Sequence, residues 1–140
     1  MESFTRCLTP SYLITYKGDV YTIFTNKVPF ELVLRNLINN AIKHHDNTAG
    51  QINVYSKEVG DLIEISVQDD GPGIPDEFKE RIFEMFQTLK PRDQVEGSGM
   101  GLAIVIKTVE IFGGKIRLES NPSQRGSNFI FTWKKQFSNI

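Results

Sequence analysis

The segment Asp69-Asp70-Gly71-Pro72-Gly73-Ile74 combines a carboxylate with glycines that let the backbone turn sharply and approach a ligand closely. The residues before it, 62–68, alternate apolar and polar side chains, which predicts a half-buried strand that ends at Asp69. A carboxylate at that position accepts hydrogen bonds only, so it suits a ligand that offers an amine, such as the edge of adenine. An ordinary strand-to-loop turn is the alternative, because Asp-Gly and Pro-Gly are common in turns.

Asn36, Asn40 and Lys43 are spaced four and three residues apart on the strongest predicted helix, residues 29–43. At this spacing they form a polar stripe beside the apolar face of the helix. Asparagine is a poor helix former, so the stripe lowers helix propensity, and a functional role would offset that cost. The carbonyl oxygen of Asn40 is a suitable Mg²⁺ ligand, and Lys43 could contact a phosphate. The alternative is a solvated polar face, followed by two histidines that stabilise the helix C-terminus.

Closely spaced glycines, Gly97-Ser98-Gly99-Met100-Gly101, precede a predicted helix over residues 102–112, which Gly113-Gly114 ends. The N-terminus of such a helix points backbone N–H groups and the positive end of the helix dipole at one place, which suits a phosphate. No Lys-Ser/Thr pair follows the glycines, as a Walker A loop requires, and no strand leads directly into them, as a dinucleotide fingerprint requires. A glycine-rich loop alone is weak evidence for a phosphate site.

The remaining segments predict a sheet and its connections. Two hairpins are expected, with strands at 12–16 and 20–25 and at 51–57 and 62–68, and two further strands at 115–120 and 128–133. A short helix is predicted from Pro75, with Phe78, Ile82, Phe83 and Phe86 on one side, and a mobile loop over 87–96. Residues 1–10 and 134–140 are expected to be loose termini.

The composition of the 140 residues favours one compact domain without a disulfide framework. The mass is 15.9 kDa and the single cysteine is Cys7, which suits a reducing compartment. The net charge of −1 favours neither nucleic acid nor an anionic membrane as a partner. No apolar run approaches the roughly 20 residues that cross a bilayer, and the start of the chain lacks the apolar core of a signal peptide. We therefore expect a cytoplasmic segment of a longer protein, without membrane insertion of its own; whether the parent protein is membrane-anchored stays open.

Four segments together strongly resemble the catalytic, ATP-binding domain of sensor histidine kinases. This family belongs to the GHKL, or Bergerat-fold, superfamily with DNA gyrase, the large heat-shock chaperone ATPase and the MutL repair ATPase. The resemblance covers roughly residues 20–133, and its motifs follow the family's order. They are the N box at 36–44, the first glycine box at 69–74, the phenylalanine box at 81–86 and the second glycine box at 97–102.

The resemblance implies a role for each matching position. Asp69 matches the residue that recognises the adenine amine, and Asn40 matches the Mg²⁺ ligand. Asn40 and Lys43 are implied as the catalytic pair, with Lys43 on a phosphate. The full set of implied nucleotide-contacting residues is Asn36, Asn40, Lys43, His44, Asp69, Gly71, Gly73, Ile74, Gly97, Ser98, Gly99, Met100, Gly101 and Leu102.

The resemblance also implies the fold, the cofactors and the partners. The fold is α+β, a two-layer α/β sandwich in which about three helices cover one face of a mixed, mostly antiparallel sheet. The cofactors are ATP and Mg²⁺. The partners are a dimerisation domain that carries the phosphoacceptor histidine and the receiver domain of a response regulator.

The sequence departs from the family pattern in two places. An arginine that often follows the phenylalanine box is missing, so Lys90 or Arg92 would have to contact the γ-phosphate, or this contact is absent. The phosphoacceptor block on a dimerisation helix is also missing, and His44 and His45 are poor substitutes because they belong to the N-box helix. Two alternatives also stay open: a related ATPase or protein-serine kinase of the superfamily, and a module that docks a partner without turnover.

Overall fold

The computed structural model describes residues 11–18, 23, 25–46, 48–74, 77, 81, 100–120 and 125–134. The helices and strands of this part of the chain, in sequence order, are β1 (Ser11–Gly18), α1 (Lys27–Lys43), β2 (Ala49–Val59), β3 (Leu62–Asp69), α3 (Met100–Ile111), β4 (Ile116–Ser120) and β5 (Ser127–Lys134). No helix in these ranges combines the length and the apolar composition that crossing a bilayer requires.

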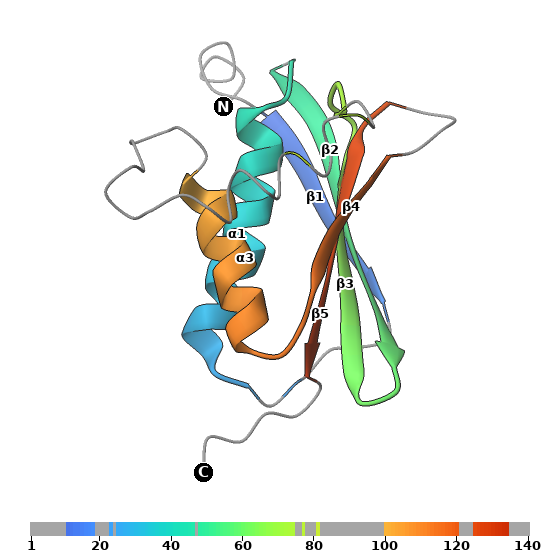
Figure 1. Ribbon diagram of the computed structural model, residues 1–140. Coiled ribbons are helices and arrows are strands. Elements are labelled where there is room, and N and C mark those ends of the chain that lie inside the picture. Colours follow the sequence, from blue (N-terminus) through green and yellow to red (C-terminus); the bar gives the residue numbers. More distant parts are fainter. Residues whose placement is uncertain are drawn as a thin grey trace.

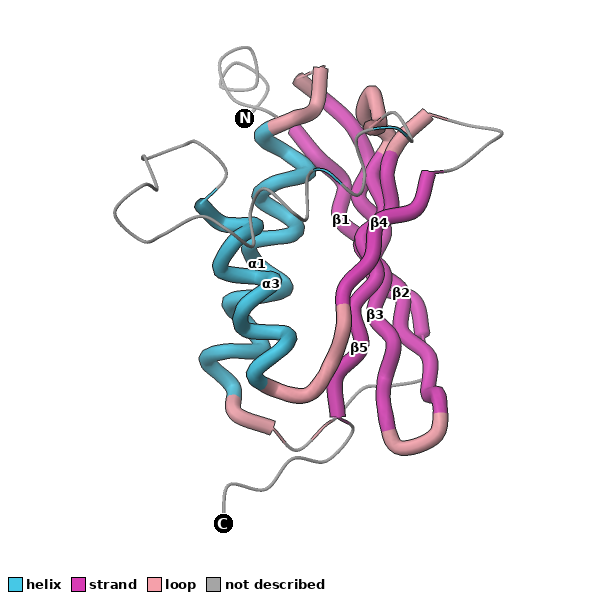
Figure 2. The backbone as a smooth tube through the Cα atoms, viewed as in Figure 1, coloured by secondary structure: helices cyan, strands magenta, loops and turns pink. Residues whose placement is uncertain are grey.

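The five strands form one sheet in the order β1-β2-β3-β5-β4. The pairing of β1 with β2 is parallel, and the three other pairings are antiparallel. Both helices lie against the same face of this sheet, so the domain has two layers (Figures 1 and 2). The α+β class and the mixed, mostly antiparallel sheet are thereby confirmed. Glu77 and Arg81 are helical where the third helix is predicted, and its other residues lie outside the described ranges.

The second predicted hairpin is confirmed and the first is not. Strands β2 and β3 pair in antiparallel register around Gly60 and Asp61, and the φ of 63° at Gly60 is one that glycine adopts without strain. The first predicted strand exists as β1, but it pairs in parallel with β2, and the described residues Ile23 and Thr25 are not in a strand. Residues 19–22 and 24 lie outside the described ranges. A parallel pair needs a long crossover, and α1 provides it here.

Both helices follow their apolar periodicity closely. The buried positions of α1 are Val33, Leu37 and Ala41, and the helix begins two residues before Pro29. The last turn of α3 is followed by a Schellman motif, in which the N–H of Gly113 donates to the Glu110 carbonyl over 3.1 Å and the N–H of Gly114 to the Val109 carbonyl over 2.9 Å. The predicted end of this helix at the two glycines is therefore correct.

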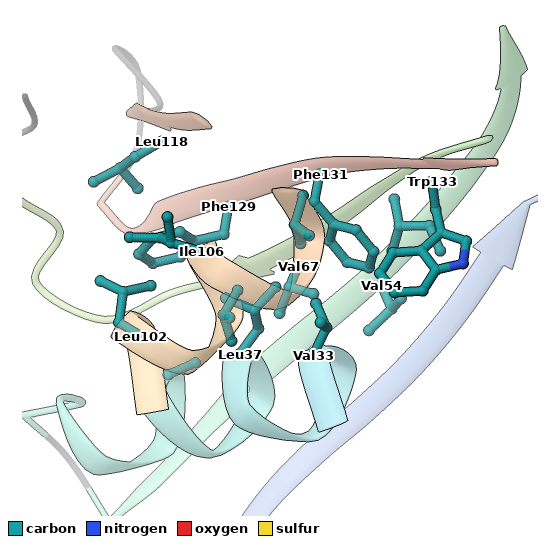
Figure 3. Packing of buried hydrophobic residues seen from close by; sticks show 14 of the residues in the cluster. Val33, Leu37, Val54, Val67, Leu102, Ile106, Leu118, Phe129, Phe131 and Trp133 are labelled. Atoms are coloured by element: carbon teal, nitrogen blue, oxygen red, sulfur yellow. The ribbon is translucent and has the colours of Figure 1, made fainter. Parts of the chain in front are cut away.

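The hydrophobic core lies between the helices and the sheet (Figure 3). Trp133 on β5 is fully buried, with its ring stacked on Phe112 at 5.0 Å and edge-on to Phe30 at 5.3 Å. The indole N–H donates to the Thr25 hydroxyl over 2.8 Å, so the polar atom of this buried ring is satisfied. The core thereby fixes α1 and α3 against β3 and β5, the elements that carry the predicted site residues.

Candidate nucleotide-binding site

The predicted site residues gather at one end of the sandwich. The last residues of β3 and α1 and the first residues of α3 all lie at the upper end of the molecule in Figure 1. The β2–β3 turn and the connection from α3 to β4 lie at the opposite end. The two-layer packing therefore brings the first glycine box, the N box and the last three residues of the second glycine box to a common edge.

The carboxylate of Asp69 is held in a fixed orientation by its neighbours. Its Oδ1 accepts hydrogen bonds from the backbone N–H of Gly71 over 2.9 Å and from that of Ser127 over 3.4 Å. Its Oδ2 accepts a hydrogen bond from the Ser127 hydroxyl over 2.9 Å. A carboxylate has about four acceptor positions, so roughly one remains for a ligand donor. This half-buried, pre-oriented acceptor can recognise an amine.

Gly126 allows β5 to approach Asp69 this closely. Its φ of 114° is outside the range that residues with a side chain usually adopt. A Cβ at this position would lie closer to the Asp69 carbonyl oxygen than the 3.0 Å that Cβ atoms keep. The absence of a side chain at Gly126 is therefore needed for the hydrogen bonds between Ser127 and Asp69.

Gly71, Gly73 and Ile74 of the first glycine box follow Asp69 and are buried or half-buried. Gly71 is buried, Gly73 is half-buried, and the half-buried side chain of Ile74 packs against the hydrophobic core. A Cβ on Gly71 would lie 3.1 Å from Asp69 Oδ1, a distance tighter than most Cβ contacts. A Cβ on Gly73 would lie 3.0 Å from the Gly126 carbonyl oxygen, so both glycines are close to residues that orient Asp69.

The polar stripe of α1 runs along the site edge to the end of the helix. Asn36 and Asn40 are half-buried, and Lys43 and His44 are exposed. Lys43 is the last helical residue, and the N–H of His44 donates to the Asn40 carbonyl over 3.1 Å as the C-cap. The four predicted residues thus extend from the middle of α1 to its C-cap, and Lys43 and His44 at the end are exposed to solvent.

The start of α3 lies directly beside this stripe. A Cβ on Gly101 would be 3.2 Å from Asn36 Oδ1, so the two helices approach closely where the N box meets the second glycine box. Met100 is the first residue of the helix, and the side chain of Leu102 is buried in the core and so is not available to a ligand. Gly97, Ser98 and Gly99 lie outside the described residues, as do Lys90 and Arg92.

The donor atoms on α1 fit magnesium better than a transition metal. Among the residues that the structure describes, no three His, Cys, Asp or Glu side chains are grouped closely enough to hold a metal ion. Mg²⁺ differs from such metals because it takes few protein oxygens and keeps phosphate oxygens and waters as its other ligands. The half-buried amide of Asn40, one turn from Asn36, offers such an oxygen.

The structure adds residues that the sequence patterns did not reveal as part of the site. Ser127 orients Asp69, and its only signal in the sequence is a hydroxyl directly after Gly126 at the start of a predicted strand. His45 Nε2 lies 2.7 Å from Asp70 Oδ1, where the ring donates because an ionised carboxylate only accepts. Arg125 joins the turn before β5 to the first glycine box by donating from Nε to the Gly71 carbonyl over 2.9 Å.

Two carboxylates near this edge have lowered pKa values. Burial acts to raise the pKa of Asp70, but hydrogen bonds from the Gln51 N–H, at 3.0 Å, and from His45 outweigh it, so the pKa lies below its ordinary value of 3.8. The hydrogen bond from Arg125, at 2.6 Å, lowers the pKa of Asp46 in the same direction. Both groups are therefore charged at neutral pH.

The fold and the site together define a two-layer α+β domain whose ligand edge is formed by a strand end and two helix ends. Residues 25–136 match the family described as "Histidine kinase-, DNA gyrase B-, and HSP90-like ATPase". The chain belongs to this family and is a nucleotide-binding domain.

Relatives and solved structures agree with this assignment. The phytochrome-like protein Cph1 of Synechocystis sp. is 40% identical over 82% of this chain and 15% of its own length. The adaptive-response sensory kinase SasA of Prochlorococcus marinus is 36% identical over 85% of this chain and 32% of its own length. The chain thus spans less than a third of the length of these two curated relatives.

The histidine kinase ThkA provides a structural comparison. Its nucleotide-free catalytic domain matches with a TM-score of 0.72 and 33% identity, covering 89% of this chain and 80% of that domain. ThkA in complex with the response regulator protein TrrA matches with a TM-score of 0.68 and 29% identity, covering 89% of this chain and 34% of the ThkA chain. The architecture described above is thus that of a histidine kinase catalytic domain.

Proposed function

We propose that this chain is the ATP-binding catalytic domain of a two-component sensor histidine kinase. The observation that carries the proposal is the Asp69 carboxylate, which Gly71 and Ser127 orient at the edge where α1 and α3 meet. The likeness to the ThkA catalytic domain and to the sensory kinase SasA supports the same function.

Base recognition in this proposal belongs to the first glycine box. The remaining acceptor position of Asp69 takes a hydrogen from the 6-amino group of adenine, and Gly71, Gly73 and Ile74 surround the ring. Guanine would place a carbonyl oxygen at that position, where two acceptors would repel each other. The site should therefore prefer adenine nucleotides.

Phosphate binding belongs to α1 and the start of α3. Lys43 contacts a phosphate as a point charge, His44 lies beside the nucleoside, and Asn36 belongs to the phosphate region. The start of α3, at Met100 and Gly101, directs N–H groups and the positive end of the helix dipole toward the phosphates. Asn40 would hold Mg²⁺ through its side-chain carbonyl oxygen. The bound metal would supply charge neutralisation on the phosphate oxygens.

Phosphoryl transfer needs mainly positioning of the donor and stabilisation of charge. A histidine on a separate dimerisation domain attacks the γ-phosphorus, a P–N bond forms, the bond to the bridging oxygen breaks, and ADP leaves. The acceptor is not His45, whose side chain is only 1% exposed. A response-regulator aspartate receives the phosphoryl group next, a proposal supported by the ThkA complex with TrrA. The domain itself would work in the cytoplasm, within a parent kinase that supplies the dimerisation domain.

Calorimetric titration with ATP and ADP, with and without Mg²⁺, tests the binding step. Wild-type chain should bind both nucleotides, and Asp69→Asn should lose most of this affinity. Asp61→Asn is the matched control, because this exposed aspartate lies in the β2–β3 turn at the opposite end. Asn40→Ala should lose only the Mg²⁺-dependent share of the affinity. Binding that is unchanged in Asp69→Asn would place the nucleotide elsewhere and overturn the proposal.

Incubation with labelled ATP and a supplied dimerisation domain tests the transfer step. The expected product is phosphohistidine, which is acid-labile. An acid-stable phosphoserine would instead assign the chain to the protein-serine kinases of the family. Phosphate release without a phosphorylated protein would assign it to the ATPases.

A further inference from the structure

A cluster of charged and polar side chains joins three segments around the first glycine box. His45, just after α1, is almost fully buried, with Nε2 against Asp70 and Nδ1 3.5 Å from Asp46 Oδ1. The ring is also in edge contact with Tyr12 of β1, at a centroid distance of 5.4 Å. The His45 ring therefore sits in a closed environment between the first strand, the end of α1 and residue 70.

Arg125 closes this cluster from the side of β5. Its Nε donates to the Gly71 carbonyl over 2.9 Å, and its terminal nitrogen donates to Asp46 Oδ1 over 2.6 Å. The planar guanidinium presents its donors in a fixed fork, so one side chain fixes two acceptors at once. A continuous path of contacts thus runs from Asp70 through His45, Asp46 and Arg125 to Gly71.

The path ends on the residue that also orients the base-recognising carboxylate. Gly71 donates its N–H to Asp69 Oδ1 and accepts from Arg125 at its carbonyl. Movement of the Gly71 backbone would therefore change the direction of the Asp69 carboxylate. Space around the cluster is also restricted, because a Cβ on Gly50 would lie 2.6 Å from His45 Nε2.

We infer that Arg125 and His45 are positioning residues that direct Asp69 toward the amino group of the base. The inference rests on the proposed adenine recognition by Asp69. Neither residue needs to touch the nucleotide. Arg125 and Asp46 are each about half exposed, at 49%, so their ion pair contributes little to global stability. Loss of Arg125 should accordingly alter base recognition far more than the folding equilibrium.

The test compares ATP with purine riboside triphosphate, which lacks only the 6-amino group. Arg125→Gln should weaken ATP binding by about tenfold, as expected when a charge-assisted hydrogen bond loses its alignment. Its affinity for purine riboside triphosphate should change less than about twofold, because Asp69 makes no hydrogen bond to that base. Arg117→Gln is the matched control: this arginine on β4 bonds Glu119 and Glu64 across the sheet surface, and its loss should leave both affinities unchanged.

Variants at His45 provide a second, independent measurement. His45→Gln keeps an N–H donor for Asp70 and should retain most of the preference for ATP over purine riboside triphosphate. His45→Leu removes the donor and should lose that preference. A folded His45→Leu chain that keeps the preference would overturn the role of His45. If His45→Leu does not fold, Arg125→Gln decides whether the cluster positions Asp69.

Each outcome separates this inference from the proposed function. If Asp69→Asn loses ATP binding but Arg125→Gln keeps the wild-type preference for ATP, the positioning role is wrong and the proposed function stands. An equal loss for both nucleotides in Arg125→Gln would assign Arg125 a merely structural role and overturn the inference. If wild-type and Asp69→Asn chains bind ATP equally, the proposed function and the inference both fall.

Discussion

Replacing Gly126 with alanine should both destabilise the domain and weaken its binding of ATP. The backbone φ of 114° would cost a residue with a side chain about 1–3 kcal/mol. The new Cβ would also overlap the Asp69 carbonyl oxygen and lie 3.3 Å from Asp70 Cα, and forced displacement in a packed region costs about 1–3 kcal/mol more. The free energy of unfolding should therefore fall by about 2–6 kcal/mol.

Variants of two other glycines separate the strain of a positive φ from the steric overlap of the new Cβ. Gly60→Ala introduces a side chain at φ 63° with no atom within 4 Å, so it should cost only about 1 kcal/mol of conformational strain. Gly114→Ala brings a Cβ into the Thr132 carbonyl at the opposite end of the sheet, without a positive φ. It should destabilise the domain by steric overlap and leave the nucleotide site intact.

The measurements are urea unfolding followed by the fluorescence of Trp133 and calorimetric titration with ATP under conditions where each variant is folded. We expect at least a tenfold loss of ATP affinity in Gly126→Ala, because β5 must move away from Asp69 and the Ser127 hydrogen bonds are lost. Wild-type affinity is expected in Gly60→Ala and Gly114→Ala. A folded Gly126→Ala chain with wild-type affinity would refute the reasoning, as would an equal loss of affinity in Gly114→Ala.

Three further perturbations test other parts of the structure. Thr25→Val leaves the buried indole N–H of Trp133 without its acceptor and should lower the free energy of unfolding by about 1–3 kcal/mol, measured by urea titration; no change would mean that water replaces the hydroxyl. Because the pKa of Asp70 is lowered in the folded state, the ionised carboxylate stabilises the fold at pH values above 3.8, its ordinary pKa. This contribution is lost as the pH falls from 3.8 through the folded-state pKa. The stability difference between wild type and Asp70→Asn should therefore shrink below pH 3.8, and a constant difference would contradict the assignment. Gly101→Ala should change the free energy of unfolding by less than about 1 kcal/mol, because the gain in helix propensity offsets the close contact of 3.2 Å between the new Cβ and Asn36 Oδ1. The same variant should lower the affinity for ATP if Asn36 belongs to the phosphate region.

The segments with a clear period were predicted well from the sequence. The apolar spacing in α1 and α3 and the alternation in β2 and β3 are local properties of the chain, and these elements appear within about two residues of their expected bounds at most ends. The position of Asp69 at the end of β3 follows from the same alternation. These elements are sufficient to place the predicted motifs on a strand end and two helix ends.

The pairing of distant segments could not be predicted in this way. Alternation identifies β1 as a strand but does not state whether its neighbour is antiparallel or parallel, so the predicted first hairpin was wrong. The role of Ser127 depends on the β3–β5 register, in which Gln68 lies opposite Asn128. His45 and Arg125 were missed because their partners are fixed by tertiary packing, which leaves no periodic signal in the sequence.

The long sequence separations within the site link nucleotide binding to the folding of the entire sheet. Asp69 and Ser127 are 58 residues apart, and Asp46 and Arg125 are 79 residues apart. Contacts between residues so far apart in the sequence form late in folding, because the entropic cost of closing a long loop must be overcome first. A folding intermediate that contains only the β2–β3 hairpin and α1 would therefore carry an intact N box and first glycine box without an oriented carboxylate. Nucleotide would bind and stabilise only the complete domain, by about 2.7 kcal/mol when the nucleotide concentration is one hundred times the dissociation constant. If the fragments separate, cleavage of the chain between β3 and β5 would abolish the proposed adenine recognition, although each fragment would keep its motif.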